Sequence, residues 1–202
     1  MHNSADYGRG GGIYLENSPA RLTGNVVRGN SMGGTGGAGG GIYLKGCDGA
    51  ALAANTVAGN SADYGGGIYL SQGIVTMTAN RVVSNTTILD SGWGASTKRQ
   101  ANPSAMIEAS ALGSGGGLLL DGGTLTLDGG LLMGNRAYGS GDGGGIFLAG
   151  RATLESIVLA DNWAGGRGSG VFVEADSVSF THATMARNRT TSGEAGTGIY
   201  VA

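Results

Sequence analysis

Two acidic residues, Asp128 and Glu155, stand at equivalent places in a sequence that repeats itself. Each directly follows an alternating segment, Leu125–Leu127 or Ala152–Leu154, with the two-residue period of a strand. If these segments stack as neighbouring strands, the backbones beside the two carboxylates lie about 5 Å apart. That separation suits the paired carboxylates of a retaining glycosidase. Because no other reactive side chain converges on the pair, two solvated surface acids are the competing interpretation.

Other kinds of site lack the residues that they need. His2 and His182 are the only histidines and Cys47 is the only cysteine, so we expect no metal site and no internal disulfide. Residues 34–39 fit the pattern GxGxxG, but a strand-like segment follows them, whereas dinucleotide binding needs a helix there. The sequence therefore predicts no cofactor.

Composition excludes two classes of partner. The net charge is −2 and only two lysines occur, so the positive surface that nucleic-acid binding requires is missing. No run of about 18 apolar residues is present, so we expect no membrane-spanning helix.

Glycine makes up 44 of the 202 residues and marks a repeat. The motif Gly-Gly-Gly-Ile-Tyr-Leu and its variants place their first apolar residue at positions 13, 42, 68, 118, 146, 171 and 199. Five of the six steps average about 27 residues, and the sixth is 50 residues long. We interpret the long step as one repeat that carries an inserted loop at about 87–111. This loop contains Trp93, a further candidate binding residue.

Within each repeat, alternating apolar residues and a recurring asparagine indicate three short strands. Such a unit can bury its apolar face only by stacking on copies of itself. We therefore predict an all-β fold, a right-handed parallel β-helix (a solenoid) of about six coils. Glycine before the first strand allows a tight corner, and asparagine tolerates the left-handed conformation and can hydrogen-bond from coil to coil. The predicted turn ladder consists of Asn30, Asn60, Asn85, Asn135, Asn162 and Asn188.

The middle position of the first strand is aromatic in six of seven repeats. If the flanking aliphatic residues point inward, this column points outward. An exposed apolar stripe is typical of a contact surface for a sugar or a partner protein, and the competing interpretation is aromatic stacking that only stabilises the sheet. The candidate binding residues are Tyr14, Tyr43, Tyr69, Phe147, Phe172 and Tyr200, and Leu119 occupies the remaining repeat.

The repeat resembles that of a known protein family. Gly-Gly-Gly-Ile followed by apolar-x-x-Asn is similar to the Gly-Gly-Ala-Ile and Phe-x-x-Asn repeats of polymorphic outer membrane proteins. More broadly, it resembles the right-handed parallel β-helix repeats of the pectin-lyase-like superfamily. Here Gly replaces the family's Ala, and Val, Leu or Met replaces Phe. The resemblance implies an adhesin-like stalk that is secreted or held at a bacterial surface.

The predicted domain, residues 1–202, begins and ends in the middle of a coil. Asn3–Tyr7 repeats Asn60–Tyr64, and the last strand stops at Val201. A segment cut from a longer solenoid is one interpretation, and end-to-end self-association through the open edges is the other. Residues 1–4 lack a signal-peptide pattern, so the extracellular or cell-surface location comes from the resemblance.

These observations favour a structural or adhesive β-helix segment of a bacterial protein, whose partner is a cell-surface glycan or protein. We expect no catalysis. A carbohydrate-active β-helix is the alternative, with Asp128 and Glu155 as its acids. Ice binding or self-assembly through a threonine-bearing face is a further alternative, although Arg21, Ala51 and Glu155 interrupt that face.

Overall fold

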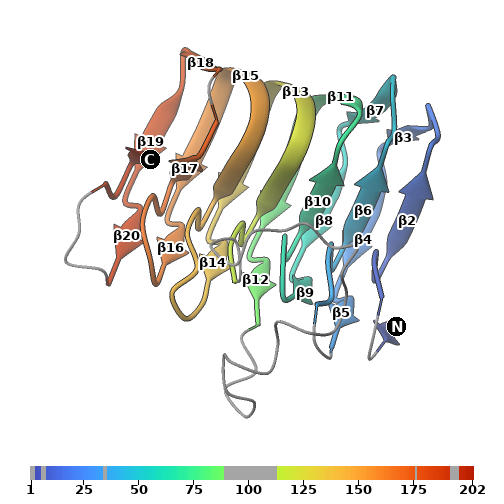
Figure 1. The fold of residues 1–202 in the computed structure, drawn as a ribbon, viewed down its shortest axis with the longest axis horizontal. Coiled ribbons are helices and arrows are strands. Elements are labelled where there is room, and N and C mark those ends of the chain that lie inside the picture. The colour runs from blue at the N-terminus through green and yellow to red at the C-terminus, as the bar shows by residue number, and fades with distance from the viewer. Residues whose placement is uncertain (1–2, 6–7, 34–35, 89–112, 176, 192–195) are drawn as a thin grey trace.

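Short parallel strands, stacked coil upon coil, make up the computed structural model of this chain (Figure 1). The structure describes residues 3–5, 8–33, 36–88, 113–175, 177–191 and 196–202. The insertion expected at 87–111 lies outside the described residues except for Thr87 and Ile88, and so does Trp93. The all-β, parallel solenoid that the repeat predicted is confirmed. Among the described residues, no helix is long and apolar enough to cross a membrane.

The strands form two sheets in which every pair is parallel. A seven-stranded sheet has the order β1 (Ser4–Ala5), β5 (Ser31–Met32), β9 (Ser61–Ala62), β12 (Thr86–Thr87), β14 (Arg136–Ala137), β16 (Trp163–Ala164) and β20 (Arg189–Thr190). The fourteen-stranded sheet contains β2 (Ile13–Glu16), β3 (Arg21–Thr23), β4 (Val26–Arg28), β6 (Ile42–Lys45), β7 (Ala50–Ala53), β8 (Thr56–Ala58), β10 (Ile68–Ser71), β11 (Ile74–Val83), β13 (Leu118–Met133), β15 (Ile146–Ala160), β17 (Val171–Val173), β18 (Val178–Thr181), β19 (Thr184–Ala186) and β21 (Ile199–Val201).

Each full coil has four strand segments, one more than the repeat indicated. The three expected segments belong to the larger sheet, and in β13 and β15 they run together as one continuous strand. The additional segment is only two residues long and follows the ladder asparagine. Two residues are too few to show a recognisable alternation in the sequence, so this segment escaped prediction.

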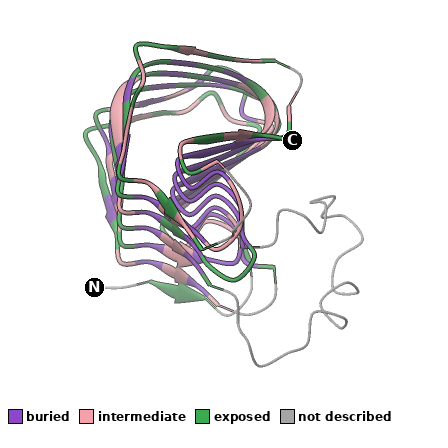
Figure 2. Ribbon diagram, turned by 90° about the vertical axis from the view of Figure 1, so that its left-hand side faces the viewer, coloured by how far each residue is buried: buried purple, intermediate pink, exposed green. Residues whose placement is uncertain are grey.

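The main core fills the inside of the coils (Figure 2). It contains the aliphatic residues that flank the aromatic position, such as Ile42 and Leu44, and the inward residues of the next segments, such as Leu52 and Val57. All four are at most 1% exposed. This agrees with the strand period, because residues two positions apart share one face.

The glycine triplets perform two separate tasks. Gly39, the first of its triplet, has a φ of +66°, the left-handed corner that the sequence predicted. Gly41, the third, has an ordinary φ, but a Cβ there would lie 2.7 Å from the Gly67 carbonyl oxygen and 2.8 Å from Val57 Cγ1. The later glycines are therefore required by the close approach of neighbouring backbone and side chains.

The ladder asparagines form one continuous, mostly buried column. The amide nitrogen of Asn60 donates to Asn85 Oδ1 over 3.0 Å, and the backbone N–H of Asn60 donates to the same oxygen over 2.9 Å. Asn85 Nδ2 in turn donates to the carbonyl oxygen of Val57 in the previous coil. The same pattern of amide bonds links Asn3, Asn30, Asn60, Asn85, Asn135, Asn162 and Asn188.

The prediction that the ladder asparagines adopt the left-handed conformation is wrong, because none of them has a positive φ. The preceding residue carries the positive φ, as at Ser84 (54°), Asp161 (56°) and Arg187 (54°). The asparagine is free of that strain and serves the hydrogen-bond column alone. A second, shorter column of Asn25, Asn55 and Asn80 runs beside it in the first three coils.

We predict that Asn85→Ala lowers the free energy of unfolding by about 3–5 kcal/mol, because several buried donors and acceptors lose their partner. Asn85 is 0% exposed. The matched control is Asn25→Ala at the exposed end of the shorter column, where we expect a loss of about 1 kcal/mol or less. Urea denaturation followed by circular dichroism measures both. Equal losses would show that the buried ladder contributes nothing beyond an exposed one.

Candidate functional site

The aromatic column forms a stack that runs along the helix axis. Tyr43 pairs in register with Tyr14 on one side and Tyr69 on the other. The ring centroids of Tyr14 and Tyr43 lie 5.4 Å apart and those of Tyr43 and Tyr69 lie 5.0 Å apart, with both ring pairs tilted by only 9°. Phe147 and Phe172 stack in the same way at 5.0 Å.

The prediction that the aromatic column faces solvent is wrong for its five middle members. Tyr43, Tyr69, Leu119, Phe147 and Phe172 are at most 3% exposed and form a second core, separate from the main core. Of the two terminal members, Tyr14 is 42% exposed and Tyr200 is half-buried.

The chain's own corners cover these rings. Ala38 and Tyr64, each directly before a glycine triplet, pack against the aromatic cluster. The guanidinium of Arg9 lies 5.4 Å from the Tyr43 ring centroid. The turn at each triplet brings the preceding residues over the strand that follows, so the outward side of that strand is not solvent. Rings that are already enclosed cannot present a contact surface.

Two tyrosines of the stack make hydrogen bonds through their hydroxyl groups. The hydroxyl of Tyr69 donates to Asp121 Oδ2 over 2.7 Å, and burial raises the pKa of this tyrosine well above its ordinary value. The hydroxyl of Tyr14 donates to Glu16 over 2.7 Å, and Lys45 Nζ lies 2.7 Å from the same carboxylate. The hydrogen bond from Lys45 holds the pKa of Glu16 below its usual range.

Arg167 lies over the last two rings of the aromatic stack, at its C-terminal end. Its guanidinium lies 4.9 Å from the ring centroids of both Phe172 and Tyr200. It also forms an ion pair of 3.0 Å with Asp142, whose side chain is buried. The hydrogen bond to Asp142 raises the pKa of Arg167.

The predicted acid pair is brought together and remains in water. Asp128 and Glu155 are register partners on β13 and β15, and both are exposed. Thr78 and Thr181 continue the column on either side. In the parts of the chain that the structure describes, no group of three or more His, Cys, Asp or Glu side chains could hold a metal ion.

The threonine-bearing face lies on the same outward side. Thr76, Thr126, Thr153 and Ser179 are consecutive register partners and all are exposed. Ala51 and Arg21 continue this column toward the N-terminus, so its hydroxyl groups cover only part of the face.

One group of surface residues was not predicted from the sequence. Arg136, Trp163 and Arg189 are consecutive register partners on the seven-stranded sheet, and Tyr138 contacts Trp163 with ring centroids 5.2 Å apart. We call these four residues the arginine–tryptophan strip. The available signal was position, since each of the three register partners directly follows a ladder asparagine.

We predict that Tyr69→Phe weakens the loss of stability at alkaline pH. Burial raises the pKa of Tyr69 in the folded state. The contribution of its protonated hydroxyl group to the free energy of unfolding is therefore fully present below the unfolded pKa, and it falls as the pH rises above the ordinary value of 10.0. Unfolding free energies, measured in urea from neutral pH to above that value, should fall less steeply in the variant than in the wild type. The control is the exposed Tyr138→Phe. If both variants match the wild-type slope, Tyr69 does not contribute.

Comparison with known proteins identifies the fold at family level. No curated protein and no solved structure matches this chain. Residues 11–202 match the family described as the right handed beta helix region, which agrees with the predicted handedness. The match extends over almost all of the coils described above. The chain therefore belongs to the right-handed β-helix family.

Proposed function

We propose that this chain is a structural or adhesive β-helix segment of a bacterial secreted or cell-surface protein, and we test the adhesive role. The resemblance to polymorphic outer membrane proteins, within the broader pectin-lyase-like superfamily, supports this role. The observation that carries the proposal is the asparagine column that links every coil from Asn3 to Asn188. A column of this kind ties each coil to the next and makes a rigid scaffold.

The distribution of polar groups supports a scaffold as well. Among the described residues, every buried side-chain nitrogen or oxygen has a hydrogen-bond partner. Most of these partners belong to the neighbouring coil, as with Asn60 and Asn85. The interior polar groups are thus engaged in stacking, and the outward columns are left to meet a partner. We propose that this partner is a cell-surface glycan or protein.

A solenoid also presents its outward residues in a regular way. Successive coils lie about 4.8 Å apart, so six steps extend over about 29 Å. The rigid backbone keeps these columns at fixed spacings, so less conformational freedom is lost on binding a partner than with a flexible chain. An extended, rigid surface of this kind suits adhesion to a polymer or a cell surface.

We expect beads coated with the folded chain to attach to glycan-coated or cell-coated surfaces, because the outward columns are preorganised for contact. Retention under buffer flow measures the attachment. Beads coated with the same chain after heat unfolding are the control, since they carry the same composition without the fold. Absence of retention on every surface tested, with the fold intact by circular dichroism, would contradict the adhesive role.

The carbohydrate-active alternative rests on one observation, the register pairing of Asp128 with Glu155. Both side chains lie in water, whereas a retaining pair depends on surroundings that give its two carboxylates different roles. We therefore expect no release of reducing sugars from a panel of polysaccharides. Should release occur and be abolished by Asp128→Asn but not by the exposed Asp48→Asn, the chain is an enzyme and the scaffold proposal fails.

A further inference from the structure

The third strand segment of each coil presents an apolar face to solvent. Its inward residues, such as Leu132 and Leu159, lie in the main core, so the residues on either side of them point outward. These outward residues form two columns of register partners, Arg81, Leu131, Val158 and Thr184 in one and Val83, Met133, Ala160 and Ala186 in the other. We call these eight residues the third-segment face. Six of them are apolar, and Met133 and Val158 are each 37% exposed.

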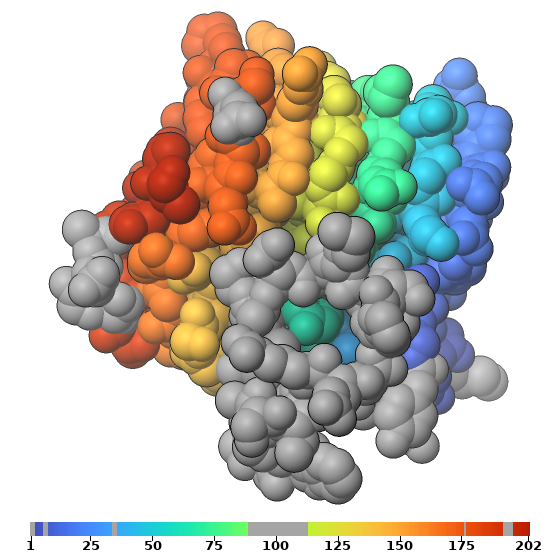
Figure 3. Space-filling view, in the orientation of Figure 1, coloured from blue at the N-terminus to red at the C-terminus, as the bar shows by residue number. Residues whose placement is uncertain are grey.

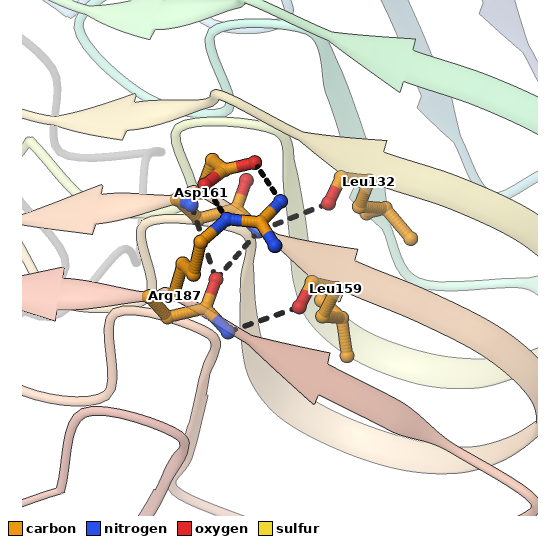
Figure 4. Close-up of polar contacts among 6 residues, drawn as sticks. Leu132, Leu159, Asp161 and Arg187 are labelled. Atoms are coloured by element: carbon orange, nitrogen blue, oxygen red, sulfur yellow. Dashed lines mark hydrogen bonds and ion pairs between the residues drawn. The ribbon is translucent and has the colours of Figure 1, made fainter.

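Hydrogen bonds hold the border between this face and the seven-stranded sheet in place. Ladder amides donate to the carbonyl oxygens of Leu132 and Leu159 (Figure 4). Beside them, Arg187 makes two hydrogen bonds of 2.7 Å to the carboxylate of Asp161, and this pair adds no net charge to the border. The coils lie side by side as parallel ribs in the space-filling view (Figure 3). The columns of the face therefore keep a fixed spacing.

Opposite charges line the two long edges of the third-segment face. Asp128 and Glu155 are register partners, and each stands three residues before an apolar residue of the face. Arg136 and Arg189 each stand three residues after the face, on the seven-stranded sheet. All four side chains are exposed, and none of them forms an ion pair with another described residue. The face thus has an acidic edge and a basic edge whose charges are uncompensated.

This distribution of charge selects one way of packing two copies of the face. If the solenoid axes are parallel, a two-fold axis along them places the acidic edge of each copy against the basic edge of the other. Asp128 and Arg136 belong to the same coil, so they meet at one level. Glu155 lies one coil away from Arg136 and from Arg189. Antiparallel axes would bring acid to acid and arginine to arginine, and such like-charge contacts oppose association.

We infer that this chain forms a dimer in which the third-segment faces of two copies pack together with parallel solenoid axes. The apolar columns supply the contact, because the column of Leu131 and Val158 lies against the column of Met133 and Ala160 in the second copy. The charged edges fix the orientation. Because the interface is isologous, each contact occurs twice. The inference goes beyond the proposed function, and it holds whether or not the chain adheres to a surface.

Other outward columns of the solenoid suit a second copy less well. The hydroxyl column that contains Thr126 and Thr153 is polar and exposed, so water competes for each of its hydrogen bonds. The aromatic column is enclosed by the chain's own corners, as at Tyr69, which is 1% exposed. Among the columns described above, those of the third-segment face combine exposed apolar side chains with opposite charges at the two edges.

Sedimentation equilibrium of the whole chain tests the inference. We expect the mass to rise from one copy to two with concentration, and added salt should weaken the dimer because exposed charges are screened. Val158→Lys should raise the dissociation constant at least tenfold, since it brings two like charges together within the face. Ile74→Lys is the matched control, because Ile74 is 58% exposed at the start of the second segment and lies outside the face. It should leave the constant unchanged, and circular dichroism checks the fold of each variant.

A charge swap tests the role of the two edges. Asp128→Arg and Arg136→Asp should each raise the dissociation constant at least tenfold, because each creates two like-charge contacts in the dimer. The variant that carries both substitutions exchanges the two charges and should restore the constant to within a few-fold of the wild type. Tighter association of either single variant would show that like edges meet, and this result would overturn the parallel arrangement.

Cross-linking measures the orientation directly. Val26 on β4 and Thr184 on β19 lie in one column of register partners, five coil spacings or about 24 Å apart. In the parallel dimer each position faces its own copy, so Val26→Cys and Thr184→Cys should each give a cross-linked dimer with a short bismaleimide. The native Cys47 is buried, and the unsubstituted chain is the control. Cross-links that form only in a mixture of the two variants would show an antiparallel dimer instead.

Three further results overturn the inference. These are a monomer at every concentration, a trimer or larger assembly, and a dimer that Val158→Lys leaves intact. A monomer that binds a model amphipathic helix of leucine and lysine, with binding lost in Val158→Lys, would assign the face to a helix of another protein. If coated beads adhere but the chain stays monomeric, only the dimer is wrong. If the chain dimerises but the beads do not adhere, only the proposed adhesive function has failed.

Discussion

Hydrogen bonding between buried asparagine amides is the interaction on which this molecule depends. From Asn60 to Asn188 the amide oxygen of each ladder residue accepts two bonds from the preceding coil, as Asn85 does from Asn60. The amide nitrogen donates both to the next asparagine and to a main-chain carbonyl of the preceding coil. A slip of one residue in any coil would leave these buried groups unpaired, and each unpaired group costs about 1–3 kcal/mol. The ladder therefore holds every other column of the solenoid in register.

Register explains why the two cores remain separate. Once the coils are aligned, aliphatic residues such as Leu44 stack inward and the aromatic residues stack on the opposite side of the same strands. The glycine triplets then bring backbone into contact across the corner, at a distance that Gly41 tolerates and a Cβ would not. The aromatic side is closed by the residues before each triplet. A face that would be solvent-exposed in an isolated sheet becomes interior in this fold.

The same constraint determines where chemistry is available. Buried polar side chains are committed to neighbouring coils, and charged groups such as Asp142 and Arg167 are paired. What is left outside is a set of regular columns with one residue in each coil. These include the hydroxyl column that contains Thr126, the acid pair of Asp128 and Glu155, and the arginine–tryptophan strip. Such columns would offer a partner an extended surface, which is why we propose binding rather than catalysis.

The repeat alone determined the solenoid, its parallel strands, its core positions and the asparagine column. Each of these follows from a pattern that recurs with every coil, so one-dimensional spacing carries the information. The sequence could not reveal that Tyr43 and Tyr69 are enclosed, because burial on the outer side of a strand depends on where the preceding corner lies in space. It also missed the short strand that contains Trp163, since two residues show no period. Tertiary structure alone decided which outward columns meet water, because that depends on how each corner folds over its neighbours.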